Sequence, residues 1–320
     1  MQGLVTVFGG SGFVGNHVVR ALARRGLRLR VAVRNPGRGY RLRMLGDVGQ
    51  IEVVQANVRN PASVARAMAG AQGCVNLVGV LYESGRQKFQ SVHAMGARNV
   101  AEAAKAEGVQ RFVQVSAIGA DPDSPSKYAR TKAMGEAAVR EVMPSAVILR
   151  PSIVFGPEDD FFNRFAAMAA LSPVLPLIGG GATRFQPVFV GDVAAAVASA
   201  VLDPATEGRT FELGGPGVYS FKALMQMICR ETGRRPFLAP VPFPIADLIG
   251  LGGDLVAGFI APPLTSDQVK QLRSDNVAAA GAPGLTELGV EPTALEAILP
   301  TYLFRYRKGG QYAEAVARSA

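Results

Sequence analysis

The sequence contains little cysteine and little histidine. Among its 320 residues, Cys74 and Cys229 are the only cysteines, and their separation fits no paired motif. This excludes a disulfide framework and favours a reducing compartment. The two histidines, His17 and His93, are also far apart, with no cluster of metal-ligating residues around them. We therefore expect no metal site.

The sequence also lacks an uninterrupted apolar run of membrane length. Its most apolar stretch, residues 234–264, contains several prolines together with Asp247 and Asp254, so we expect no transmembrane span. Two alternatives fit this stretch: an amphipathic helix against a membrane or a partner, and a helix packed on its own domain. No signal or transit peptide precedes the first apolar segment, which favours a bacterial cytoplasmic protein or one already processed.

The charge balance is strongly positive, with a formal net charge of +9 at pH 7. A basic surface attracts anionic lipid, acidic protein or nucleic acid. No aromatic-basic stacking motif and no recognition helix stands out, so we expect no nucleic-acid partner. Hydrophobic residues make up 48% of the chain, which suffices for a large core and argues against disorder.

The first segment has the pattern of a strand, a glycine turn and a helix. It covers residues 5–22, VTVFGGSGFVGNHVVRAL. In such a turn the first glycine permits the tight bend, the second leaves room for a pyrophosphate, and the third lets the helix pack closely on the strand. The N–H groups at the start of the helix then point at the phosphates. The predicted dinucleotide contacts are Gly9, Gly10, Ser11, Gly12, Phe13, Val14 and Gly15.

The residue after the second predicted strand, 28–33, selects between two nicotinamide cofactors. Proteins that bind NAD tend to place an acid about 20 residues beyond the glycine turn, where it holds the ribose hydroxyls. This chain has Arg34 instead. A guanidinium pairs with the 2′-phosphate that a carboxylate would repel. We therefore predict NADPH (NADP) rather than NADH.

Strands and helices alternate through the first half of the chain. After the second strand, strands are predicted at 51–58, 74–81, 111–120 and 146–157, and helices at 63–69, 89–107 and 128–142. This alternation predicts an α/β fold, a Rossmann-type doubly wound parallel sheet with helices on both faces. We expect residues 1–157, joined by about 186–206, to form this domain. Residues 158–185 and 207–320 are expected to form a smaller, mostly C-terminal α/β lobe that faces a partner or a membrane.

Several motifs together resemble a known family. FGGSGFVG, YARTK and LRPSIVFGP are similar to the extended and atypical short-chain dehydrogenase/reductase superfamily. FGPEDDFFNRFA, FQPVFVGDVAAAV, LTSDQVKQL and GVEPTALE resemble, more narrowly, the NADPH-binding accessory subunit of respiratory complex I (NADH:ubiquinone oxidoreductase). The resemblance covers nearly the whole chain. It implies a tightly bound NADPH, and a place near the quinone site where the peripheral arm meets the membrane domain, outside the electron path.

The resemblance also implies partners and a location. Other complex I subunits are the expected partners, with lipid headgroups as a further candidate contact. The expected location is peripheral, on the cytoplasmic side of a bacterial inner membrane, or on the matrix side of the inner mitochondrial membrane if the protein is organellar. Residues 302–312, YLFRYRKGGQY, mix aromatic and basic side chains, and they fit either a surface for partner or lipid or a solvated tail.

The superfamily's catalytic pair is Tyr-x-x-x-Lys, which corresponds here to Tyr128 and Lys132. The spacing places both side chains on one helix face. The ammonium is expected to lower the pKa of the phenol, so that Tyr128 can exchange a proton with a carbonyl, while Lys132 also holds the nicotinamide ribose. Ser116 ends the fifth strand, but Ala117 and Ile118 follow it where active enzymes often offer further hydroxyls. This departure argues against turnover, and it leaves Ser116 either as a cap of the strand end or as a cofactor contact.

The remaining contacts follow from position within the resemblance. The predicted contacts are Asn57 and Val58 beside the adenine, Gly79 near the adenine ribose, and Pro151 and Ser152 beside the nicotinamide. We expect Asp192 to be a helix N-cap. Three functions stay open: a non-catalytic NADPH-binding subunit, which we favour, a free-standing NADP-dependent short-chain reductase or epimerase, and an NADPH-sensing regulator.

Overall fold

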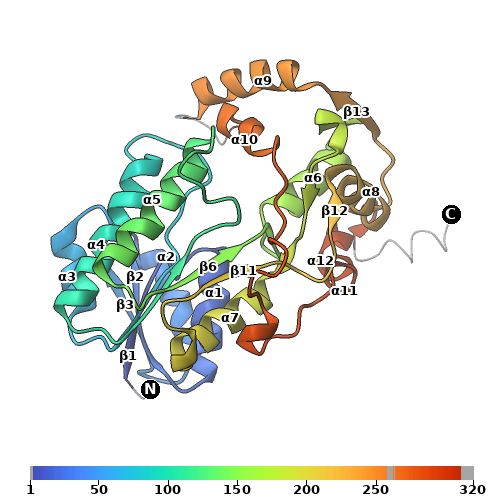
Figure 1. Cartoon of the computed structure of the whole chain (residues 1–320). Helices are drawn as coiled ribbons and strands as arrows, with labels where there is room; N and C mark the ends of the chain where they lie inside the picture. The colour runs from blue at the N-terminus through green and yellow to red at the C-terminus, as the bar shows by residue number, and fades with distance from the viewer. Residues whose placement is uncertain (1–2, 258–261, 263, 311–320) are drawn as a thin grey trace.

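The centre of the molecule is a seven-stranded parallel sheet. The structure, a computed structural model, describes residues 3–257, 262 and 264–310. The strands of the sheet are β1 (Leu4–Phe8), β2 (Arg28–Val33), β3 (Ile51–Gln55), β4 (Gly73–Asn76), β5 (Arg111–Val115), β6 (Val147–Pro151) and β11 (Thr210–Leu213). They lie in the order β11-β6-β5-β4-β1-β2-β3, and each neighbouring pair is parallel (Figure 1).

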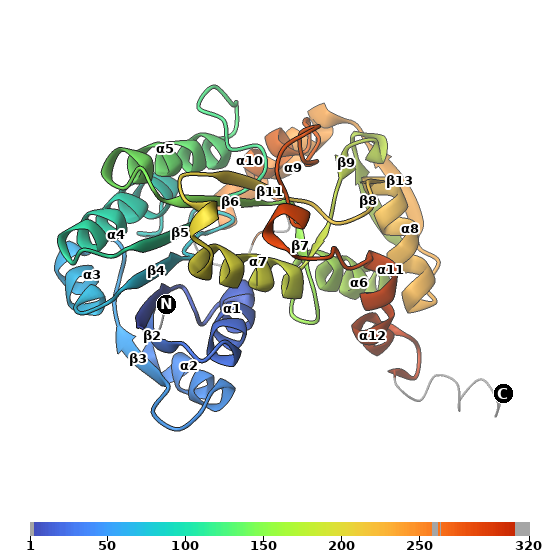
Figure 2. The same ribbon diagram turned by 60° about the horizontal axis from the view of Figure 1, so that its bottom comes forward.

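Helices cover both faces of this sheet, so the doubly wound fold is confirmed (Figure 2). One face carries α1 (Phe13–Arg24) and α7 (Val190–Leu202), and the other carries α3 (Pro61–Met68), α4 (Met95–Ala106) and α5 (Lys127–Val142). Shorter elements connect them: α2 (Pro36–Gly39), a 3-10 turn at Tyr40–Leu45 and a π-helical turn at Gln90–Ala94. In α1, Val18, Val19 and Leu22 are fully buried because helical spacing places them on the inward face.

A smaller lobe has its own short paired strands and helices, outside the main sheet. Its paired strands are β7 (Val154–Phe155) with β10 (Val188–Phe189), β8 (Val174–Ile178) with β13 (Phe237–Val241), and β9 (Arg184–Phe185) with β12 (Tyr219–Ser220). Its helices are α6 (Phe161–Leu171), α8 (Phe221–Thr232), α9 (Phe243–Val256), α10 (Ser266–Gln271), α11 (Leu295–Ile298) and α12 (Pro300–Leu303). Phenylalanine and leucine side chains of α6, α8, α11 and α12 form a separate core for this lobe.

One part of the expected domain division is wrong. We expected residues 207–320 to lie in the lobe, but β11 forms the edge of the main sheet. The reason is backbone pairing, since Thr210 to Leu213 lie in parallel register with Ile148 to Pro151 of β6. The rest of the division stays a prediction.

Two motifs of the family resemblance hold the lobe together. Asp159, in FGPEDDFFNRFA, accepts hydrogen bonds from the Phe162 N–H and from the Tyr302 hydroxyl, both at 2.6 Å. Asp192 accepts hydrogen bonds from the N–H and the hydroxyl of Thr293, at 2.7 and 2.8 Å. The expected N-cap role of Asp192 is wrong, because this residue lies inside the first turn of α7 and joins α7 to the GVEPTALE segment instead.

The aromatic and basic stretch near the C-terminus packs on the lobe. Tyr302 and Leu303 are buried in the lobe core. Arg305 donates to the Pro157 carbonyl at 2.6 Å, and Arg307 donates to the Glu231 carbonyl at 2.7 Å. The expectation of a solvated tail is therefore wrong for residues 302–307, whereas contact of this stretch with a partner or with lipid stays a prediction. Residues 311 and 312 lie outside the described part of the chain.

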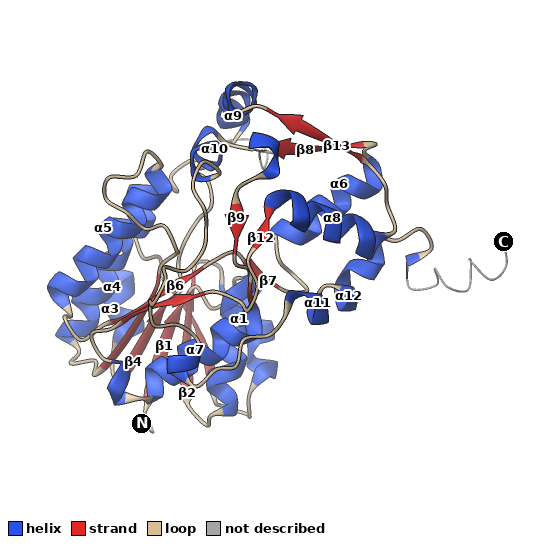
Figure 3. Cartoon of the chain, turned by 45° about the vertical axis from the view of Figure 1, so that its right-hand side comes forward, coloured by secondary structure: helices blue, strands red, loops and turns tan. Residues whose placement is uncertain are grey.

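Helix α9 has the reverse of the usual amphipathic arrangement. Its small residues, Ala246, Gly250 and Gly253, face inward, and a Cβ added to Gly250 would come within 2.8 Å of the Ser266 backbone. Large apolar side chains face outward, with Leu248 70% exposed. The helix lies at the edge of the lobe away from the main sheet (Figure 3). None of the helices in the described part of the chain is long and apolar enough to cross a membrane.

Candidate functional site

The glycine turn between β1 and α1 forms a cradle with an open outer side. Gly9 has a φ of +83°, which a side chain would strain. A Cβ on Gly15 would come within 2.6 Å of Gly10 Cα, so the third glycine is required for the close contact of helix and turn. A Cβ on Gly12 would meet only the Gly9 carbonyl oxygen, at 3.4 Å. The space beside Gly12, at the N-terminus of α1, is therefore free for a phosphate.

A basic pocket lies beside the ends of β2 and β3. It encloses about 260 Å³, and its lining residues are Arg34, Gln55, Ala56, Asn57, Asn60, Ser63 and Arg66. These lining residues, all in the described part of the chain, include two arginines and no acid. Arg34 donates a hydrogen bond to the Gln87 side chain. Because glutamine is uncharged, this contact does not neutralise the positive charge of Arg34. Sequence reasoning missed Arg66, because it lies on α3, far along the chain from Arg34.

Asn57 and Val58 follow β3 as expected. The Asn57 side chain accepts from the Arg59 N–H at 3.1 Å, which forms a tight turn at the strand end. Val58 is buried against α4, where a Cβ on Gly96 would come within 2.9 Å of it. The structure thus places Asn57 in the basic pocket and Val58 in the core against α4. Their contact with the adenine stays a prediction.

The loop after β4 brings Gly79 to α5. A Cβ on Gly79 would lie 3.3 Å from Lys132 Nζ. His93 fixes this loop, since its Nε2 accepts from the Val80 N–H at 3.0 Å and its Nδ1 lies 3.1 Å from Thr131 Oγ1. Burial, and secondarily the charge of Lys132, lowers the pKa of His93 to about 3, so the imidazole is neutral and its Nδ1–H donates to Thr131.

Tyr128 and Lys132 lie on one face of α5, but their electrostatics differ from the expectation. Burial lowers the pKa of Lys132 to about 8, against the opposing charge of Glu136. Burial, and then the Asp267 carboxylate, raises the pKa of Tyr128 to about 12. The prediction that Lys132 lowers the pKa of the phenol is therefore wrong in this structure. The ammonium lies 5.8 Å from the ring centroid, and desolvation outweighs its attraction.

Ser116 marks the other side of the same site. It is 4% exposed, and among the residues that the structure describes its Oγ is the one buried side-chain atom without a hydrogen-bond partner. Leaving such a hydroxyl unpaired costs about 1–3 kcal/mol, so this atom suits a polar ligand. Together with the open cradle at Gly12, it fits a dinucleotide that extends from the glycine turn to the end of β5.

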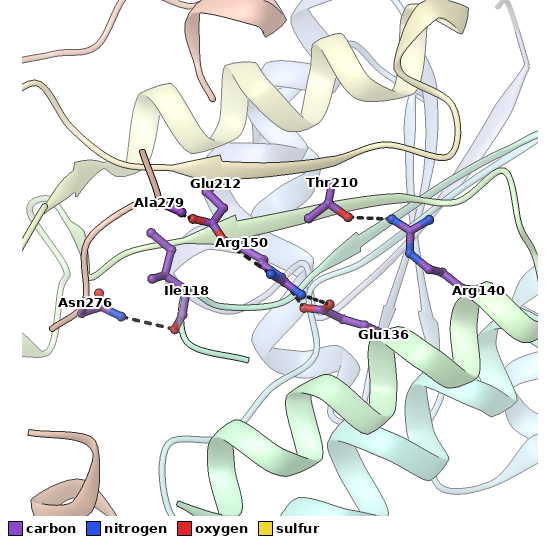
Figure 4. A network of polar contacts seen from close by, with 8 residues as sticks. All are labelled: Ile118, Glu136, Arg140, Arg150, Thr210, Glu212, Asn276 and Ala279. Carbon is purple, nitrogen blue, oxygen red and sulfur yellow. Dashed lines mark hydrogen bonds and ion pairs between the residues drawn. The ribbon is translucent and has the colours of Figure 1, made fainter. Parts of the chain in front are cut away.

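The expected contacts after β6 are held by the lobe. Asn276 Oδ1 lies 2.7 Å from Ser152 Oγ and accepts from the Ile153 N–H at 3.1 Å. The Nδ2 of Asn276 donates to the Ile118 carbonyl at 3.3 Å (Figure 4). Pro151 accepts from the Ile118 N–H at 3.0 Å. Asn276 thus ties the ends of β5 and β6 together, a role that no local pattern in the sequence indicates.

An ion network anchors α5 to the sheet beside these contacts. Arg150 on β6 donates to Glu136 of α5 at 2.6 Å and lies 3.4 Å from Glu212 of β11 (Figure 4). Glu212 also accepts from the Ala279 N–H at 2.8 Å. Since Glu136 is buried, its charge requires this partner. The network fixes the helix that carries Tyr128.

Asp267 of the lobe completes the site at the start of α5. Its carboxylate accepts hydrogen bonds from Ser126 Oγ at 2.8 Å, the Lys127 N–H at 2.6 Å and the Tyr128 N–H at 3.1 Å. Sequence reasoning noted the LTSDQVKQL motif but gave this residue no role. More than 130 positions separate the partners, so only the fold brings them together.

Comparison with known proteins agrees with this geometry. Residues 5–214 match the NAD dependent epimerase/dehydratase family. Over 97% of its length, the chain is 36% identical to NADH dehydrogenase (ubiquinone) 1 alpha subcomplex subunit 9, mitochondrial, of Arabidopsis thaliana, and it covers 80% of that protein. The chain belongs to this epimerase/dehydratase family, and within it to the subunit 9 group. The superfamily resemblance and the narrower complex I resemblance are both confirmed.

Two further likenesses add to this picture of the subunit 9 group. The chain is 34% identical to the ceramide reductase of Caulobacter vibrioides, over 76% of this chain and 75% of that protein. Its fold resembles the NADPH-dependent quinone oxidoreductase of Escherichia coli complexed with NADPH, with a TM-score of 0.70, 20% identity, and coverage of 98% and 99% of the two chains. Family and turn together assign a nicotinamide dinucleotide as the ligand class.

Proposed function

We propose that this chain is the NADPH-binding accessory subunit of a respiratory complex I and that it holds its cofactor without turning it over. Its place is the junction of the peripheral and membrane arms, near the quinone site. The observation that carries the proposal is a contrast within one site. The cradle at Gly12 has room for a pyrophosphate, whereas at the end that would activate a carbonyl, burial and then the Asp267 carboxylate raise the pKa of Tyr128.

The basic pocket supports NADPH over NADH. Arg34 and Arg66 line one small space with no acid among its described lining residues. Charge-assisted hydrogen bonds from guanidinium to phosphate are among the stronger polar contacts in proteins. The ribose hydroxyls of NADH would find no carboxylate here. A 2′-phosphate would give these two arginines the negatively charged partner that the pocket lining does not supply.

The nicotinamide end supports retention rather than turnover. A phenol with a pKa of about 12 gives up its proton poorly at neutral pH. Ala117 and Ile118 supply no hydroxyl to polarise a substrate, and the Ile118 carbonyl is already bound by Asn276. Lys132 remains placed to hold the nicotinamide ribose. Tight binding of the nucleotide would then stabilise the folded subunit by mass action.

The outward side of α9 supports docking to the complex. Its exposed leucines, isoleucines and valine are Ile245, Leu248, Ile249, Leu251, Leu255 and Val256. An apolar surface of this kind on one helix marks an interaction site. We infer that α9 faces the complex I subunits at the junction and lipid headgroups beside them, with the subunit peripheral on the cytoplasmic side of a bacterial inner membrane, or on the matrix side of an organelle.

The test starts from protein extracted gently from native membranes. On a native gel, the chain should migrate with NADH:quinone activity and carry NADPH that survives gel filtration and is not consumed by NADH:quinone turnover. A chain that migrates alone and exchanges NADPH freely would contradict the proposal. The variant Leu248→Glu/Leu255→Glu should lose co-migration while keeping NADPH. Its control is Leu171→Glu, at a leucine 89% exposed on α6, which should migrate like the wild type.

A second candidate function is an NADPH-dependent carbonyl reductase. The observation that favours it is the complete Tyr128 and Lys132 pair, together with the relationship to the Caulobacter ceramide reductase. This function requires the phenol to donate a proton to the reduced carbonyl oxygen. Consumption of NADPH with any member of a panel of ketones, abolished in Tyr128→Phe, would establish it. No consumption by the isolated, NADPH-loaded chain would exclude it for that panel.

A further inference from the structure

The segment from Thr265 to Asn276 crosses from the lobe to the nucleotide-binding half at two places. Near its start, Asp267 accepts hydrogen bonds from Ser126, Lys127 and Tyr128. Near its end, Asn276 binds the ends of β5 and β6. The nicotinamide side of the site is therefore framed by one short piece of the lobe.

Asp267 binds the N-terminus of α5 through a carboxylate, an interaction that is stronger than a neutral hydrogen bond. The first turn of a helix has N–H groups without intrahelical partners, and its positive dipole end favours a carboxylate. Ser126 caps the Ala129 N–H with its side chain, at 3.3 Å. Asp267 accepts from the remaining first-turn N–H groups of Lys127 and Tyr128, and from the Ser126 hydroxyl itself. The lobe therefore supplies half of the N-terminal capping of this helix.

The same segment is packed tightly against α9. A Cβ on Gly250 would lie 2.8 Å from Ser266 Cα, so the two backbones are in close contact. Asp254 of α9 accepts hydrogen bonds from the N–H and the hydroxyl of Ser266. Because Ser266 directly precedes Asp267, a shift of α9 would be transmitted to the carboxylate that caps α5.

On the other side, α5 carries Lys132 one turn beyond this cap. Lys132 is 8% exposed, and its ammonium lies 3.5 Å from the Val115 carbonyl, beside Gly79. A nucleotide whose ribose binds this ammonium restrains α5 one turn from the Asp267 contact. A continuous set of hydrogen bonds and close backbone contacts thus leads from the nicotinamide end to the exposed face of α9.

We propose that Asp267 is a positioning residue that couples the nucleotide site to the α9–α10 docking surface. The proposal rests on the proposed function, since it requires a bound nucleotide and a docking lobe. NADPH binding then orders α9 and α10 for docking, and by reciprocity docking tightens the hold on NADPH by the same factor. The cofactor has a structural effect at a distance without any redox step.

Hydrogen exchange of the full-length chain, with and without saturating NADPH, tests the proposal. In the wild type, NADPH should slow exchange of the amides of residues 9–16 and, by at least about 5-fold, those of α9 and α10. In Asp267→Asn the slowing at 9–16 should remain, whereas that of α9 and α10 should fall below about 2-fold. A residue that only stabilised the fold would change exchange without NADPH and leave the NADPH-dependent slowing intact.

The control is Asp275→Asn, an equivalent change in the same segment, whose carboxylate binds Arg184 within the lobe at 2.7 Å. It should keep the full NADPH effect on α9 and α10. If Asp267→Asn does not fold, Ser126→Ala removes one of the three bonds and should weaken the effect. Full slowing in the Asp267 or Ser126 variant, or none at α9 in the wild type, overturns the coupling. Absence of slowing at residues 9–16 instead overturns nucleotide binding itself.

Discussion

The two ends of the nucleotide site are built differently. The end proposed for the pyrophosphate and adenosine is formed by the first part of the chain: the turn at residues 9–15, the exits of β2 and β3, and Arg66 of α3. The nicotinamide end is formed by α5 and β5 from one half of the molecule, and by Asp267 and Asn276 from the lobe. The first end is open and basic, whereas the second is crossed by the chain itself.

Under the proposed function, this difference explains how a fold shared with enzymes could bind the nucleotide without catalysing a reaction. Binding depends on space and positive charge, which the first end retains. Reaction depends on a phenol with a low pKa and on a free polar group beside it. Desolvation and a nearby carboxylate raise the pKa of Tyr128 to about 12. Burial and the Asp267 contact from the lobe thus both act to keep the Tyr128 phenol protonated.

The largest expected effect is at the pyrophosphate end. Gly12→Ala adds a methyl group that meets only one protein atom but fills the space beside the helix N-terminus. We expect at least about a 100-fold loss of NADPH affinity by calorimetry, with the free energy of unfolding changed by no more than about 1 kcal/mol. Gly15→Ala is the matched control, because its Cβ clashes with the turn and should lower the stability by about 1–3 kcal/mol. Unchanged NADPH affinity in Gly12→Ala would show that the space beside Gly12 does not bind the pyrophosphate.

The adenosine end should show the next largest effect. Arg34→Ala should weaken NADPH binding about 10- to 100-fold, and Arg66→Ala about 3- to 10-fold, because each removes charge-assisted hydrogen bonds to the 2′-phosphate. Neither change should alter NADH affinity. Arg20→Ala, at an exposed arginine on α1, is the control and should bind both cofactors normally. Equal losses for NADPH and NADH would contradict the assignment of this pocket to the 2′-phosphate.

Lys132 should give a moderate pH dependence at the nicotinamide end. Its pKa of about 8 means that the ammonium of the nucleotide-free chain loses its proton as the pH rises above that value. A dinucleotide favours the charged form, so NADPH affinity should fall by about 10-fold between pH 7 and pH 9. Lys132→Met should bind more weakly and show a flat profile. Affinity that rises over this pH range would mean that the group binds the nucleotide in its neutral form.

The smallest effect is expected at Tyr128, which corresponds to the catalytic tyrosine of short-chain dehydrogenases/reductases. Tyr128→Phe should change NADPH affinity, and the NADH:quinone activity of the complex, by less than about 2-fold, because a phenol with a pKa of about 12 stays protonated in either case. Thermal unfolding of both proteins is the control for folding. A large loss of any NADPH-consuming activity in this variant would show that Tyr128 takes part in a reaction, against the proposed non-catalytic role.

Local sequence patterns predicted the strands and helices of the nucleotide-binding half, which depend on contacts between residues close in sequence. The second strand was expected at 28–33 and is observed at Arg28–Val33, and the helix expected at 128–142 is observed at Lys127–Val142. These elements follow from hydrophobic periodicity and from capping signals, which act over a few residues. The same holds for Gly12 and Arg34, whose positions relative to a strand end define their surroundings.

The roles that sequence reasoning missed or misjudged involve contacts across the chain. Asp267 meets Tyr128 across 139 positions, and Asn276 meets Ser152 across 124. The pKa of Tyr128 was misjudged because a Tyr-x-x-x-Lys spacing shows the ammonium but neither the burial nor the distant carboxylate. No periodicity or spacing rule contains this information.

Residue pattern alone therefore specifies a doubly wound nucleotide-binding sheet and its glycine turn, and it predicts a preference for a phosphate over a free ribose hydroxyl. Those features depend on backbone geometry and on charges near one strand end. Only the tertiary structure decides that the pKa of Tyr128 is raised by burial and by Asp267, and that α9 presents its leucines to the outside. Desolvation and capping by a distant carboxylate depend on which segments the fold places together.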